Sequence, residues 1–127
     1  QNEFAFAGAS SSYPYIGTTG LATCIAVVFY DAKSKMGAIA HLDTKSDVGS
    51  LSSIIDRFPK HSKLLVTING GDASHDSQVK AKEIFSLLSD NPYVSIETVH
   101  VNEKDHPRML LMDTHTGLLY EQELCEV

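Results

Sequence analysis

Cys24 and His41 are the two residues of this sequence whose types and spacing can do chemistry. Cys24 lies near the start of the apolar run TCIAVVFYD, and His41 closes the next apolar run, MGAIAH, seventeen positions later. A thiolate is a strong nucleophile, and an imidazole within hydrogen-bond reach can take the thiol proton. The pair therefore indicates a cysteine nucleophile with a histidine base. The alternative is a small, buried cysteine that only fills space in a strand.

A β-hairpin is the element that must position the two residues. Residues 23–31 are rich in Val, Ile, Phe and Tyr, which is typical of a strand. Residues 36–41 predict the returning strand, and the polar segment AKSK at 32–35 predicts the turn between them.

The length of that turn sets how His41 faces the first strand. A loop at 32–35 sets His41 opposite Ala26 and diagonal to Cys24 on the same face, whereas a loop at 32–33 sets it directly opposite Cys24. Both registers bring the two side chains to roughly 5–8 Å from each other at Cβ. The hairpin thus predicts a contact between the thiol and the imidazole.

Small and hydroxyl residues are concentrated just before Cys24, in the stretch GTTGLAT at 17–23. A turn there can leave backbone N–H groups free near the thiol, as an oxyanion hole requires, and we expect those around Thr23 to do so. A hydroxyl from this stretch can also orient His41, as the third member of a catalytic triad does.

The stretch TTGLATC, followed seventeen positions after its cysteine by AH, resembles the active-site signature of cysteine amidohydrolases with the bacterial-toxin-deamidase fold. Chemoreceptor glutamine deamidases (CheD) have a Thr six residues before the Cys and a His seventeen after it, and Thr18, Cys24 and His41 stand at those positions. In protein N-terminal asparagine amidohydrolases, the corresponding signature begins with ATTC and continues with H-x-D and then T-K. The segments LATC and HLDTKSDV make this second branch the closer one, and the resemblance runs from about Ile16 to Tyr120.

The resemblance implies a hydrolase that deamidates an Asn or Gln carboxamide, including N-terminal Asn, in a protein or peptide substrate. It implies the catalytic residues Cys24, His41 and Thr18, without a cofactor. Further expected residues at the site, for oxyanion binding or as its lining, are Thr19, Thr23, Gly70 and Gly71. The alternative function is a non-catalytic protein-binding module on the same fold, in which Cys24 is structural.

The remaining elements predict an α+β fold in the order ββαβαβββ: a mostly antiparallel sheet or small sandwich with two packed helices. Residues 1–15 are expected to be a loose N-terminal arm and residues 16–127 a single domain, with a short edge segment at 13–17 across their boundary. Apolar periodicity and turn residues predict helices at 47–58, capped near Ser46, and at 77–89, and strands at 63–68, 94–101, 108–113 and 118–123.

The composition of the chain argues against some classes of binding partner. The chain has 43% hydrophobic and 20% charged residues and a net charge of −6, with no basic cluster, which argues against nucleic-acid binding. No apolar run approaches the 18 residues typical of a membrane span. The two cysteines predict a reduced, cytoplasmic setting, while a Cys24–Cys125 bridge and a secreted or delivered effector remain alternatives.

Other polar clusters fit structural roles better. His75 with Asp72 and Asp76 offers mostly exposed carboxylates rather than converging metal ligands, so a solvated loop and helix N-cap is expected there and no metal. Asp43 and Asp47, close to His41, are expected to be turn and helix-start acids.

Overall fold

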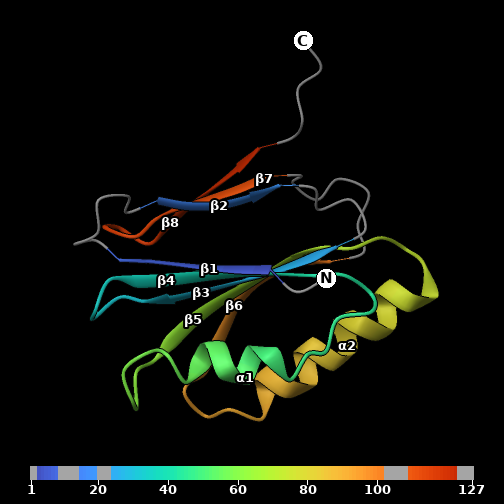
Figure 1. Cartoon of the computed structure of the whole chain (residues 1–127), viewed down its shortest axis with the longest axis horizontal. Helices are drawn as coiled ribbons and strands as arrows, with labels where there is room; N and C mark the ends of the chain where they lie inside the picture. Colours follow the sequence, from blue (N-terminus) through green and yellow to red (C-terminus); the bar gives the residue numbers. More distant parts are fainter. Residues whose placement is uncertain (1–2, 9–14, 20–23, 102–108, 123–127) are drawn as a thin grey trace.

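The computed structural model describes residues 3–8, 15–19, 24–101 and 109–122. These residues form three layers: a small sheet, a larger central sheet, and two helices on the other face of the central sheet (Figure 1). The arrangement confirms the predicted α+β class, with a mostly antiparallel sandwich and two packed helices. In this described part of the chain, no helix combines the length and apolar character needed to cross a membrane.

Among the described residues, the central sheet has five strands in the order β1-β4-β3-β5-β6, and the small sheet has three in the order β2-β7-β8. The strands are β1 (Glu3–Gly8), β2 (Tyr15–Thr19), β3 (Ile25–Asp31), β4 (Met36–Leu42), β5 (Leu64–Gly70), β6 (Val94–Val101), β7 (Met109–Asp113) and β8 (Leu118–Gln122), and the helices are α1 (Ser50–Ile55) and α2 (His75–Ser89). Of the strands that the structure describes, only β5 and β6 pair in parallel, since α2 carries the chain back between them.

The β3–β4 hairpin adopts one of the two registers that the sequence allowed. Asp31 pairs with Met36 across the turn at 32–35, and Ala26 pairs with His41. All seven residues of β3 are buried. Both faces are covered because the helices pack on one side of the central sheet and the small sheet on the other, so the strand shows no alternation of apolar and polar residues.

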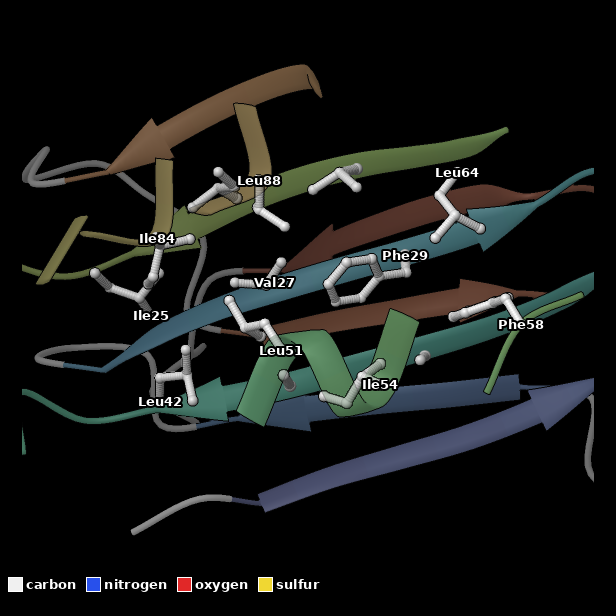
Figure 2. Close-up of a cluster of buried hydrophobic side chains, with 14 residues drawn as sticks. Ile25, Val27, Phe29, Leu42, Leu51, Ile54, Phe58, Leu64, Ile84 and Leu88 are labelled. Carbon is white, nitrogen blue, oxygen red and sulfur yellow. The ribbon is translucent and has the colours of Figure 1, made fainter. Parts of the chain in front are cut away.

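On the helix-facing side, alternate residues of the central strands meet the buried faces of both helices (Figure 2). Val27 and Phe29 of β3 lie in one cluster with Leu51 of α1 and Leu88 of α2. The alternate residues of β3, Ala26, Val28 and Tyr30, face the small sheet. There the buried cluster consists of Ala26, Val28, Tyr30, Ile39, Leu110 and Met112.

The two sheets are also joined by a buried hydrogen bond. The hydroxyl of Tyr30 in β3 donates to the carbonyl oxygen of Thr114, in the turn between β7 and β8, at 2.8 Å. Gly117 closes that turn with φ +75°, as expected for the THTG hairpin. Its Cα lies so close to the Tyr30 ring that a Cβ there would clash. The hairpin is therefore fitted to Tyr30.

The first helix is shorter than predicted. The pattern indicated 47–58 with a cap near Ser46, whereas α1 covers Ser50–Ile55. The Asp47 carboxylate accepts a hydrogen bond of 2.9 Å from the N–H of Gly49, which is the N-cap residue, and this holds the chain in a turn before the helix. The cap near Ser46 was thus wrong, because that residue lies buried in an earlier turn.

The sequence prediction also missed β1. Residues 3–8 were expected to belong to the loose arm, but they pair antiparallel with β4, with Glu3 opposite His41 and Gly8 opposite Met36. The rest of that arm up to residue 14 lies outside the described residues. The segment EFAFAG is short and rich in Ala and Gly, so its own propensity for a strand is weak; pairing with β4 decides its structure.

Candidate active site

Cys24 lies directly before the first residue of β3. Its carbonyl oxygen accepts a hydrogen bond of 2.9 Å from the N–H of Gly71, so the contact between β3 and β5 continues one residue past the Ile25–Gly70 pair. Its side chain is half-buried. The residue is held by a fixed backbone and is not fully enclosed, which is compatible with a nucleophile.

His41 lies on the face of the central sheet that packs against the small sheet. It shares this face with Ile39, two residues before it in β4, while Ala40 and Leu42 point to the helices. Because His41 pairs with Ala26, it is a diagonal neighbour of Cys24, at roughly 7–8 Å or less between Cβ atoms. The imidazole is half-buried, with its Nε2 atom inside. The register thus places the imidazole and the thiol on neighbouring positions of one face.

Two of the predicted threonines, Thr18 and Thr19, lie on β2. Thr18 stands opposite Leu110 in the β2–β7 ladder; Leu110 is buried, whereas the next residue of β7, Leu111, is exposed. β2 packs against β1 and β4, the strand that carries His41 (Figure 1). Thr19 follows Thr18 in β2 and stands opposite Met109, and Thr23 lies outside the described residues.

Gly70 and Gly71 lie against the backbone of Cys24. Both have positive φ, +114° for Gly70 and +78° for Gly71, which is a conformation that favours glycine. A Cβ on Gly70 would also clash with the carbonyl oxygen of Cys24. The two glycines therefore let β5 end tightly against the residue that precedes β3. The strand was expected to end at 68, but it includes Asn69 and Gly70.

Asn69 is a residue that the sequence reasoning passed over. It pairs with Ala26 from the β5 side, as His41 does from the β4 side, and it is fully buried. The signal that can reveal it is an amide side chain in an otherwise apolar strand, KLLVTING, directly before the glycine pair.

Comparison with known proteins now adds a family. The sequence model described as "Protein N-terminal asparagine amidohydrolase" matches residues 1–116, which includes each predicted site residue. The chain belongs to the protein N-terminal asparagine amidohydrolase family.

One relative of this chain is an uncharacterized protein of Rickettsia conorii (strain ATCC VR-613 / Malish 7). It is 29% identical over 108 residues, which cover 80% of this chain and 66% of the relative. The match thus spans just under two thirds of the relative's length. Its description carries no activity, so the family assignment rests on the model match.

Asp43 and Asp47, which follow His41 closely in the sequence, accept hydrogen bonds within turns. The Asp43 carboxylate accepts hydrogen bonds of 2.9 Å from the N–H of Lys45 and from the hydroxyl of Ser46. Asp47 accepts from the N–H of Gly49, one residue before α1. These contacts confirm Asp43 as a turn acid, whereas Asp47 lies in the turn before α1 and not in the first turn of that helix.

The chain just before His75 forms the solvated loop and helix N-cap that the sequence predicts. The side chain of Ser74 caps α2 by accepting a hydrogen bond from the N–H of Ser77, and the Asp72 carboxylate accepts from the N–H of Ser74. Within the residues that the structure describes, no group of three or more His, Cys, Asp and Glu side chains is placed to hold a metal ion.

Proposed function

We propose that this chain is a cysteine-dependent deamidase that hydrolyses the side-chain carboxamide of an N-terminal asparagine in a protein or peptide, releasing ammonia. The observation that carries the proposal is the diagonal placement of His41 beside Cys24 in a chain of the N-terminal asparagine amidohydrolase family. The half-buried state of the thiol supports it further, since a substrate must reach the sulfur.

In the first half of the reaction, His41 takes the thiol proton and the Cys24 sulfur attacks the carboxamide carbon. The carbonyl oxygen becomes an oxyanion, held by backbone N–H groups around Thr23 and Cys24. The C–N bond then breaks as His41 returns the proton to the departing nitrogen. Ammonia leaves, and the substrate stays bound to Cys24 as a thioester.

In the second half, His41 takes a proton from a water molecule, which attacks the thioester carbon. The C–S bond breaks, the sulfur regains a proton from His41, and the product leaves with an aspartate side chain. Thr18 orients the imidazole throughout, because its hydroxyl holds one ring nitrogen. Gly70 and Gly71 keep the backbone of Cys24 in place. The proposed steps use side chains and backbone N–H groups of this chain together with water.

The test is ammonia release from three matched peptides: one with N-terminal Asn, one with the same Asn placed internally, and one with internal Gln. The proposal predicts release from the first and little from the other two. Release from the internal-Gln peptide alone would assign the chain to glutamine deamidation instead. No release from any of them, with a thiol that resists iodoacetamide, would favour the non-catalytic binding module with a structural Cys24.

A further inference from the structure

The side-chain amide of Asn69 is enclosed without a partner. Asn69 is 0% exposed, and neither its Oδ1 nor its Nδ2 atom has a hydrogen-bond partner within the described structure. Buried polar side chains nearly always have at least one partner, because an unpaired buried group destabilises the fold. An amide kept in this state therefore calls for a functional explanation.

The strand places Asn69 on the same face as His41. Val66 and Ile68 of β5 point into the helix-side cluster, so alternation directs Asn69 and Thr67 to the opposite face. The bulge between β5 and β6 adds its extra residue to β6, at Glu97, and leaves the alternation of β5 intact.

The positions of Asn69 and His41 are symmetrical about β3. His41 pairs with Ala26 from β4, and Asn69 pairs with Ala26 from β5. Each is also two residues from the position opposite Cys24, which on the β5 side is Gly71. Asn69 is thus a diagonal neighbour of Cys24, just as His41 is. The thiol, the imidazole and the amide surround one small residue, Ala26.

His41 and Asn69 lie on either side of Ala26, which belongs to the buried cluster that faces the small sheet. Neighbouring strands lie about 4.7–4.9 Å apart, so the Cβ atoms of His41 and Asn69 are roughly 9–10 Å apart across β3. The Ala26 side chain between them is a single methyl group, fully buried. A group bound to the Cys24 sulfur on this face of the sheet would therefore have His41 on one side and Asn69 on the other.

We propose that Asn69 binds the substrate's carboxamide by amide-to-amide pairing, which rests on the deamidase function proposed above. Its Nδ2–H donates to the carboxamide oxygen, and its Oδ1 accepts from the carboxamide NH2. Both orphaned atoms are satisfied together. A carboxylate has no N–H to offer Oδ1, so the acid product binds less well than the amide substrate and leaves.

Two variants on one strand test this role. Asn69→Leu keeps similar volume and removes both hydrogen-bonding atoms, and Thr67→Val changes the neighbouring residue on the same face. For Asn69→Leu we expect kcat/KM on the N-terminal-Asn peptide to fall about tenfold or more. We also expect Tm to rise by roughly 2–8 °C, since an unpaired buried amide is removed. Thr67→Val should keep kcat/KM within about twofold.

Binding by the Cys24→Ala variant separates this inference from the catalytic proposal. We expect it to bind the N-terminal-Asn peptide about tenfold or more tightly than the matching N-terminal-Asp peptide, and the added Asn69→Leu change to abolish the preference. If the wild type releases no ammonia, the deamidase proposal fails, and this preference still decides the role of Asn69. Equal binding of the two peptides overturns the inference.

A structural water is the competing partner for the amide. In that case Asn69→Leu lowers Tm and leaves kcat/KM within about twofold, and the inference is overturned. If Asn69→Leu lowers both Tm and kcat/KM, peptide binding by the Cys24→Ala variant decides. A preference for the N-terminal-Asn peptide over the N-terminal-Asp peptide that disappears when Asn69→Leu is added supports the pairing. A preference that persists after Asn69→Leu is added refutes it.

Discussion

The N–H of Gly71 donates a hydrogen bond of 2.9 Å to the carbonyl oxygen of Cys24. Through this bond the end of β5 holds the residue that precedes β3, and the hairpin then sets His41 on the other side of the same strand. The candidate nucleophile is thus fixed between two neighbouring strands, and its surroundings depend on the backbone of both.

Gly70→Ala should destabilise the protein by roughly 1–3 kcal/mol from backbone strain alone. Gly70 has φ +114°, and an added Cβ would clash with the carbonyl oxygen of Cys24. Gly8→Ala is the control, because its nearest neighbours are 3.8 Å from the added Cβ. Urea unfolding measures both variants. Equal midpoints for them would show that β5 can end against Cys24 without a glycine.

Cys24→Ala should abolish ammonia release and change the free energy of unfolding by only about 1–2 kcal/mol, since one half-buried sulfur is lost. Activity and thermal unfolding are measured on the same preparation. A variant that unfolds, alongside a wild type with no activity, would identify Cys24 as a structural residue.

His41→Ala should lower the rate of Cys24 alkylation by iodoacetamide at neutral pH by roughly tenfold or more, because no base remains to take the thiol proton. Mass spectrometry of the labelled protein follows the rate. His75→Ala is the matched control, since His75 is exposed at the start of α2. An unchanged rate in the His41 variant would remove this residue from the mechanism.

Thr18→Val keeps the shape of the side chain and removes its hydroxyl. If Thr18 orients His41, kcat should fall roughly ten- to a thousandfold, less than on loss of Cys24 or His41. Thr19→Val is the control, because neighbouring strand positions face opposite sides. Steady-state kinetics on the N-terminal-Asn peptide measures both.

Equal losses in the two threonine variants, or full kcat in Thr18→Val, would show that the triad assignment is wrong. The next residue to test is then Glu3, which stands opposite His41 in the β1–β4 ladder.

Tyr30→Phe should lower stability by about 0.5–1.5 kcal/mol at pH 7, because the buried hydrogen bond between the two sheets is lost. Burial, followed by the charges of Asp113 and Asp31, raises the pKa of Tyr30. The folded state therefore retains the phenol proton, and this contribution is present below about pH 10 and lost as the pH rises through the folded pKa. The gap between wild type and variant in urea should narrow above pH 10. A gap that is constant with pH would contradict this role.

Local sequence patterns were sufficient to predict the β3–β4 hairpin. The apolar runs on either side of AKSK predict two strands, and an even-length loop places His41 on the face of Cys24 whichever of the two registers forms. Similarly, Gly117 marks the β7–β8 turn, because a tight turn needs the positive φ that glycine allows. These features depend on residues near one another in the chain.

The sequence by itself thus determined the α+β class, the β3–β4 pairing and the family signature around Cys24 and His41. Only the tertiary structure decided that β1 joins the sheet beside β4, that β2 packs over it, and that Asn69 flanks Ala26 opposite His41. The physical reason is that strand pairing joins backbones distant in sequence. A short segment such as EFAFAG acquires its structure, and an amide such as that of Asn69 its chemical setting, from the neighbours that the fold supplies.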